Sequence, residues 1–107
     1  MSPPDPYRLV FLTDVLQRLR AMGERAVKPE LRQQLAAILQ TVRDRLIHDP
    51  VNWGDPFRRL RPSGILFLSR TYSTLHFTYA VDETNRLVIV TNVTTLSKSP
   101  YAEPESS

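Results

Sequence analysis

Residues 75–93 read LHFTYAVDETNRLVIVTNV, and this stretch decides the fold. Apolar and polar residues alternate along 75–81, a pattern typical of a strand with one buried face. The apolar face carries Leu75, Phe77, Tyr79 and Val81. The polar run 82–85 predicts a turn, and residues 87–93 return as a second strand. The turn is too short for a helical crossover, so the two strands must pair antiparallel.

Two further strands are predicted outside this hairpin. Residues 65–69 (ILFLS) are almost entirely apolar, as in a strand that is covered on both sides or lies beneath helices. They are also too close to the hairpin for a crossover, which makes the three strands an antiparallel meander. Residues 7–12 (YRLVFL) have strand composition as well, with Tyr7, Leu9 and Phe11 on one face.

The segment between residues 13 and 50 predicts a helical hairpin. The first helix should begin at Thr13 and Asp14, whose side-chain oxygens can accept hydrogen bonds from its first amides, and end near Gly23. The second should begin at Pro29 and end at Asp49, before a proline. Its apolar residues recur at helical steps: Leu31, Leu35, Ile38, Val42 and Leu46. The short link between the helices makes them antiparallel.

The predicted architecture is therefore α+β with the order βααβββ, the helical hairpin packing on an antiparallel sheet. Residues 1–98 form a single domain with a flexible start at 1–6. Residues 51–64 are rich in turn-formers and predict a loop, anchored by Trp53 and Phe57. The tail 99–107 is rich in Pro, Ser and Glu, a composition that rarely packs, so we expect it to be disordered.

Composition narrows the class of protein. A chain of 107 residues suits one domain. The absence of cysteine excludes disulfides, thiolate metal sites and a cysteine nucleophile. Neither a signal peptide nor an apolar run of membrane-spanning length is visible, so the sequence predicts a cytoplasmic protein without membrane contact.

Positive charge is concentrated in one part of the chain. The formal net charge is +3, yet between Phe57 and Val81 there are four arginines and no carboxylate. Such a one-signed segment raises the affinity for nucleic acid or for an acidic protein. The alternative is that the arginine stems cover apolar surface while their heads pair with helix carboxylates.

At this point the sequence resembles the RelE/ParE superfamily of type II toxin–antitoxin toxins. Residues 7–14 (YRLVFLTD) are similar to that family's first strand and the turn into its helix pair, and residues 55–60 (DPFRRL) resemble the loop after the second helix. The hairpin 75–93, with YAVDE at 79–83, resembles the tyrosine-bearing strand, acidic turn and last strand. The resemblance covers residues 7–96. It implies a toxin that a small cognate antitoxin neutralises by wrapping it with a helix or strand.

The resemblance leaves the target open. RelE-like members cut mRNA in the ribosomal A site, whereas ParE-like members poison DNA gyrase. Ribosome-dependent members carry basic residues where this chain has Leu66 and Leu68, and an arginine where it has His76. These departures keep two alternatives beside the RNase: a non-enzymatic gyrase inhibitor, and a catalytically degenerate interaction module.

RNA cleavage by 2′-hydroxyl attack needs a base, a cation at the developing phosphorane and an acid. His76 is the candidate acid or base, with Arg59 and Arg70 as catalytic cations. Strand alternation points His76 away from the core face, and we expect it to converge with Arg70 and Tyr72 near the turn at 71–74. The candidate target-binding residues are Arg58, Arg59, Arg61, Arg70, Tyr72, Lys98 and Tyr101.

Other chemistries find no matching residues. His48 and His76 lie on different elements with no carboxylate at ligand spacing, which argues against zinc. The sequence contains neither a glycine-rich phosphate loop nor a nucleophile elbow. We therefore expect no metal and no organic cofactor.

Overall fold

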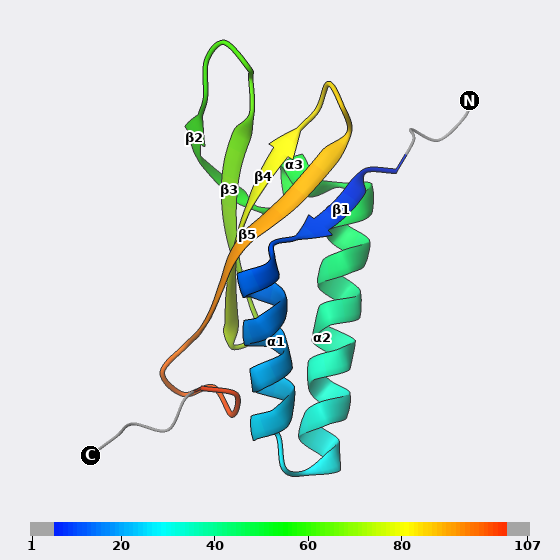
Figure 1. Ribbon diagram of the computed structural model, residues 1–107, viewed down its shortest axis with the longest axis vertical. Helices are drawn as coiled ribbons and strands as arrows, with labels where there is room; N and C mark the ends of the chain where they lie inside the picture. Colours follow the sequence, from blue (N-terminus) through cyan, green and yellow to red (C-terminus); the bar gives the residue numbers. More distant parts are fainter. Residues whose placement is uncertain (1–5, 103–107) are drawn as a thin grey trace.

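The computed structural model describes residues 6–102. Over this range the elements are, in order, β1 (Arg8–Phe11), α1 (Thr13–Arg25), α2 (Pro29–His48), α3 (Pro50–Trp53), β2 (Asp55–Arg59), β3 (Leu66–Tyr72), β4 (Leu75–Asp82) and β5 (Leu87–Thr95). The strands form one sheet in the order β1-β5-β4-β3-β2. The two long helices lie side by side and antiparallel against it (Figure 1). The predicted α+β class, with the N-terminal strand joining the sheet, is confirmed.

The meander pairs as the sequence predicts. Both β3–β4 and β4–β5 are antiparallel, with Leu68 opposite Tyr79 and Val81 opposite Val88. The apolar face predicted for residues 75–81 is buried throughout. By contrast, β1 runs parallel to β5, with Leu9 opposite Val88. Parallel pairing is possible there because the helices and the meander supply the long connection that it needs.

The structure contains a strand that the sequence did not predict. Residues of β2, assigned to a loop, pair antiparallel with β3 at the edge of the sheet, with a bulge between Pro56 and Arg58. Proline and charged side chains are typical of edge strands, because an edge leaves backbone donors unpaired and must resist further pairing. Phe57 is not the predicted anchor: its side chain is 59% exposed and packs on Phe67.

The first helix differs from the prediction at both ends. Leu12 occupies the N-cap, and no side chain caps the helix. The Leu12 N–H donates to the Val90 carbonyl oxygen at 3.2 Å, so strand pairing sets the point where the helix starts. The helix then continues past Gly23 to Arg25. The second helix has the predicted bounds, and none of the described helices is long and apolar enough to cross a membrane.

A buried hydroxyl fastens the short helix α3 to the sheet. Tyr79 donates a hydrogen bond to the Pro50 carbonyl oxygen at 2.6 Å, and Gly54 lies directly against the same hydroxyl. A Cβ at Gly54 would overlap the hydroxyl, so the close approach requires glycine. Burial raises the pKa of Tyr79, which keeps the hydroxyl protonated as a donor. Trp53 packs on Tyr79 with ring centroids 6.1 Å apart, and it is the anchor that the sequence predicted.

The domain extends beyond its predicted boundary at residue 98. Tyr101 is 1% exposed, and its hydroxyl donates to the Leu31 carbonyl oxygen at 2.7 Å. Arg25 donates to the Tyr101 carbonyl oxygen at 2.7 Å. The prediction of a disordered tail is therefore wrong for residues 99–102, because one large aromatic ring buries enough apolar area to dock a polar segment. Residues 1–5 of the predicted flexible start, and 103–107 of the tail, lie outside the described residues.

Replacing Tyr79 by phenylalanine should lower the free energy of unfolding by about 2 kcal/mol, because the Pro50 carbonyl oxygen loses its buried hydrogen-bond donor. Urea denaturation measures the effect. Tyr72→Phe is the matched control, since its half-buried hydroxyl makes no hydrogen bond within the described residues. Equal stability of the two variants would contradict the role given to the Tyr79 hydroxyl.

Tyr101→Ala should cost about 3 kcal/mol of stability, as large-to-small substitutions at buried aromatic sites do. The exposed Lys98→Ala should change stability by less than about 0.5 kcal/mol in the same urea titration. A Tyr101→Ala protein as stable as the parent would show that residues 99–102 do not belong to the domain.

Candidate nucleic-acid interface

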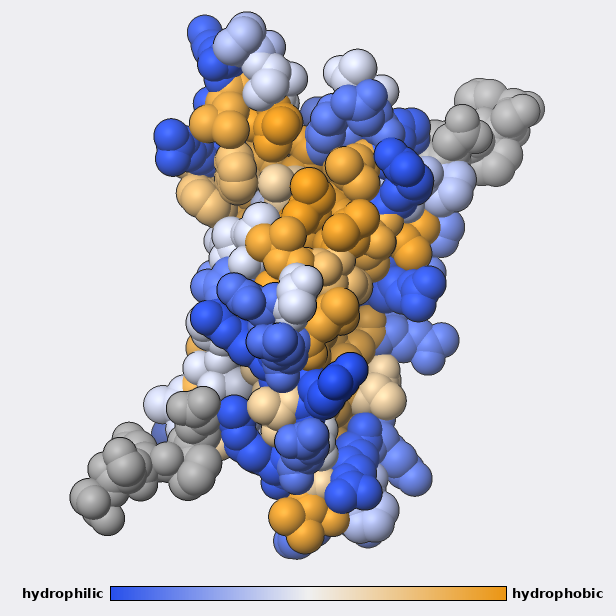
Figure 2. All heavy atoms as spheres, viewed as in Figure 1, coloured by the Kyte–Doolittle hydropathy of each residue, from blue (hydrophilic) through white to orange (hydrophobic). Residues whose placement is uncertain are grey.

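The helices cover one face of the sheet and leave the other, here called the open face, to solvent. Near the β4–β5 turn this face is apolar: Val10, Ile89, Ala80 and Phe67 lie in one row across four strands. Figure 2 shows apolar side chains gathered over the part of the sheet where β1 lies beside β5. Toward the β3–β4 turn the face becomes polar, with Ser69, Thr71, His76, Thr78 and Thr94. The open face therefore has an apolar half and a polar half.

His76 lies in the polar half, as strand alternation predicts. It pairs with Thr71 on β3 and with Thr94 on β5, and it is half-buried. Its Nδ1 hydrogen-bonds the Thr71 hydroxyl at 2.8 Å. With Nδ1 engaged, Nε2 is the ring nitrogen left to meet a substrate, which suits a proton-transfer role.

Arg18 brings a guanidinium to the same polar half from the first helix. It donates to the Asn92 side-chain oxygen and, at 3.3 Å, to the Val93 carbonyl oxygen. Asn92 pairs with Thr78, one pair along β4 and β5 from His76 and Thr94 on this face. Arg18 is not among the candidate residues that the sequence offers. The contact joins residues 74 positions apart, so no local pattern signals it.

Arg70 and Tyr72 do not converge with His76, and that prediction is wrong. Arg70 lies opposite Phe77 and Tyr72 opposite Leu75, so both point to the helix-covered face. Successive residues of a strand alternate between faces, and His76 belongs to the opposite set. The shared turn brings the backbones together but keeps the side chains on two sides of the sheet.

The remaining arginines of the basic segment lie at the other end of β3. Arg58 is exposed opposite Phe67 on the open face, whereas Arg59 lies opposite Leu66 and donates to the Gly64 carbonyl oxygen at 3.2 Å. Phe67 is four residues from Thr71, the partner of His76, which corresponds to about 13 Å along the strand. Arg59 is therefore too remote, and on the wrong face, to act with His76. Arg61 is exposed in the β2–β3 loop, which Figure 1 shows at the far end from the β3–β4 turn.

The two target-binding candidates near the C-terminus differ in their exposure to solvent. Lys98 is exposed, but Tyr101 is buried against α2 and is not available to a target.

Among residues 6–102, no group of three His, Cys, Asp or Glu side chains could hold a metal ion. The ion pair recorded in this range joins His48 and Asp44, so the described arginines of the basic segment are not neutralised by helix carboxylates.

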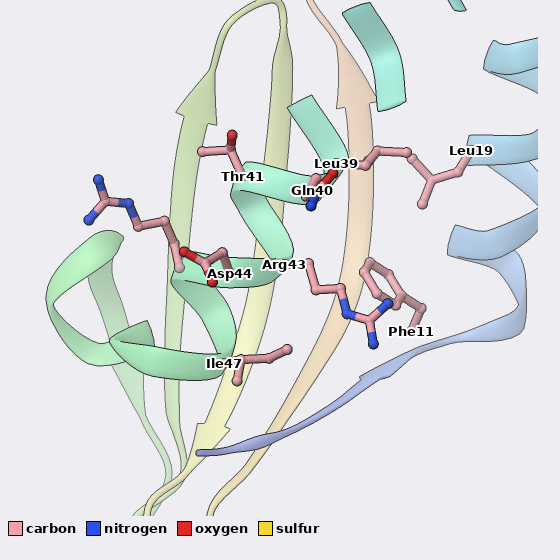
Figure 3. A pocket seen from close by; sticks show the side chains of 9 residues that line it. Phe11, Leu19, Leu39, Gln40, Thr41, Arg43, Asp44 and Ile47 are labelled. Atoms are coloured by element: carbon pink, nitrogen blue, oxygen red, sulfur yellow. The ribbon is translucent and has the colours of Figure 1, made fainter. Parts of the chain in front are cut away.

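A groove of about 870 Å³ lies on the other side of the molecule, between β1, α1 and α2. Phe11, Leu19, Leu39 and Ile47 form its apolar lining, and Arg43 stands beside them. Figure 3 shows Leu39 of the second helix pointing toward Leu19 of the first. The rest of the lining is polar or charged: Gln40, Thr41, Asp44 and Arg45. A groove of this size that combines apolar and charged side chains is typical of a binding surface.

Comparison with solved structures identifies the fold. A chain of the RelBE2 toxin–antitoxin complex of Mycobacterium tuberculosis aligns with a TM-score of 0.63 at 22% identity, over 88% of this chain and 95% of that one. A chain of the RelE–RelB complex of the archaeon Pyrococcus horikoshii OT3 aligns with a TM-score of 0.61 at 12% identity, over 87% and 98%. The isolated RelE toxin of E. coli aligns at 0.51 and 19%, over 87% of each chain.

Sequence comparison adds no relative: no protein-family model matches the chain, and no curated protein matches it. The similarity is therefore one of structure, and it extends over most of this chain and nearly all of each matched chain. The protein has the RelE-like toxin fold, as its sequence resemblance predicted.

Proposed function

We propose that this protein is the toxin of a type II toxin–antitoxin system and that its open face cleaves ribosome-bound mRNA as a metal-independent endoribonuclease. The observation that carries the proposal is the placement of His76 on the open face, where its ring is hydrogen-bonded to Thr71. The neighbouring pair on this face contains Asn92, whose side-chain oxygen accepts a hydrogen bond from Arg18. The RelE-like fold supports the toxin class. In this role the protein works in the cytoplasm, where ribosomes are.

The chemistry follows from the groups on that face. His76 accepts the proton of a ribose 2′-hydroxyl, whose oxygen attacks the adjacent phosphorus as the bond to the 5′-oxygen breaks. The products are a 2′,3′-cyclic phosphate and a 5′-hydroxyl, the latter taking its proton from the protonated imidazole or from water. The Arg18 guanidinium offsets the charge that develops on the phosphorane oxygens.

Positive charge at the other end of the sheet suits flanking phosphates. Arg58 and Arg61 are exposed, and no carboxylate of the described residues neutralises them. Lys98 adds an exposed cation after β5. Such contacts position an RNA strand without reading its sequence. Arg58, Arg61 and Lys98 would therefore bind the RNA, and His76 would transfer the proton.

The antitoxin is the proposed protein partner. RelBE2 and the archaeal RelE–RelB are toxin–antitoxin complexes, and this chain has their fold. Its groove between the two long helices supplies apolar surface with Arg43 beside it. An amphipathic antitoxin segment with acidic residues on its polar side would bury the apolar lining and pair with this cation.

His76→Ala should reduce cleavage of ribosome-loaded mRNA by about 100-fold, the usual loss when a general acid or base is removed. His48→Ala is the matched control, because this second histidine lies exposed on α2 next to Asp44. Primer extension on translated mRNA reports both variants. Intact mRNA with the parent protein, accompanied by loss of gyrase supercoiling, would contradict the proposal and fit a gyrase inhibitor instead.

Arg43→Glu should weaken binding of the proposed antitoxin by about tenfold, since it places a carboxylate where an acidic segment approaches. Gln33→Glu, exposed on the same helix and outside the groove lining, should leave the affinity unchanged. Titration calorimetry on the purified pair measures both. Equal affinities would place the antitoxin elsewhere on the surface.

A further inference from the structure

A second polar pocket, of about 350 Å³, opens on the helix-covered side at the free edge of β3. Pairing with β2 stops at Ser69, so the following residues of β3 form that edge. The pocket is lined by Thr41, Arg45 and Asp49 near the end of α2, by Asn52 and Trp53 of α3, and by Arg70 and Tyr72 of β3. It is separated from His76 by the thickness of the sheet.

Two aromatic rings and a guanidinium form one wall of this pocket. The ring centroids of Trp53 and Tyr72 are 6.3 Å apart, and both rings are half-buried. Arg70 is fixed beside them, because it donates to the Trp53 carbonyl oxygen at 3.1 Å and its Cζ lies 5.6 Å from the Trp53 ring centroid. The wall therefore offers flat apolar surface next to a held positive charge.

Arg45 contributes a second guanidinium from the last turn of α2. Within residues 6–102, no carboxylate lies within ion-pair distance of Arg45 or Arg70. The pocket's own carboxylate, Asp49, accepts a hydrogen bond from the Asn52 amide at 3.0 Å. Two guanidinium groups without an ionic partner among the described residues are suited to an anion, and Asp49 and Asn52 add hydrogen-bonding groups to the same lining.

We propose that this pocket binds a nucleotide: a phosphate between Arg45 and Arg70, with the base stacked on Tyr72 or Trp53. Each part of a nucleotide meets a matching group here. Guanidinium groups bind phosphate oxygens in a bidentate way, aromatic rings stack on any base, and the Asp49 carboxylate accepts hydrogen bonds from ribose hydroxyls. The volume suits a ligand of this size. A simple anion would use the two guanidinium groups but would leave the accessible surface of the two half-buried rings uncovered.

The ligand can be a free mononucleotide or one unit of a single-stranded RNA, since both present the same phosphate, sugar and base. The site lies on the face opposite to His76, and its occupancy does not require RNA cleavage. A nucleotide bound here would be held by residues that take no part in the chemistry proposed for the open face. Binding and cleavage can therefore fail independently.

The chain's single tryptophan makes the test direct, because its only indole N–H signal in a ¹⁵N–¹H correlation spectrum comes from Trp53. Adenosine 5′-monophosphate should shift this signal saturably, and adenosine or inorganic phosphate at the same concentration should bind at least about tenfold more weakly. If a single-stranded RNA of four nucleotides binds more tightly than the mononucleotide, the ligand is an RNA strand. Equal affinities identify the free nucleotide.

Arg45→Gln and Arg70→Gln should each weaken nucleotide binding by about tenfold or more, because each removes a charged hydrogen-bond donor. Arg20→Gln, exposed on α1 and outside this pocket, should bind as the parent does. Arg45 is exposed on a helix, so its variant keeps the fold and the test stands even if Arg70→Gln unfolds. No saturable shift up to millimolar nucleotide, or unchanged affinity in Arg45→Gln, overturns the proposal.

Discussion

The helical hairpin covers one face of the sheet and leaves the other to solvent, and this asymmetry determines where every functional group lies. Because side chains alternate along a strand, each residue of β3 and β4 is assigned either to the packed face or to the open face. Tyr79 and Phe77 are buried beneath the helices, and His76, between Phe77 and Leu75 in the sequence, is presented on the opposite side. A shift of pairing by one residue would bury the imidazole and expose the core.

The same alternation explains what could be predicted from the sequence. The strands 75–81 and 87–93 could be predicted because apolar residues recur along them at regular strand spacing, and the orientation of His76 follows from this alternation. The edge strand β2 was not readable, because its proline and arginines reflect protection of an edge and not burial. The convergence of Arg70 with His76 was predicted from nearness to a shared turn, and alternation overrides nearness.

Long-range contacts account for the other differences. Arg18 meets Asn92 and Val93 across most of the chain, and Tyr101 docks on α2 beside Leu31. Neither contact can be predicted from the neighbouring sequence, since an arginine on a helix surface and a tyrosine in a polar tail are both common in positions without such contacts. Polar composition still predicts an unpacked tail on average, but one aromatic ring with a backbone acceptor outweighs it.

A common feature connects the cations of both faces. Arg18, Arg59 and Arg70 each donate to a backbone carbonyl oxygen: those of Val93, Gly64 and Trp53. A carbonyl oxygen orients a guanidinium but carries no net charge, so the positive charge is held in place without being cancelled. A carboxylate in the same position would fix the side chain equally well and remove its attraction for phosphate. Guanidinium groups held by carbonyls are thus prepared for an anionic ligand, because part of the ordering cost of binding has already been met by the fold.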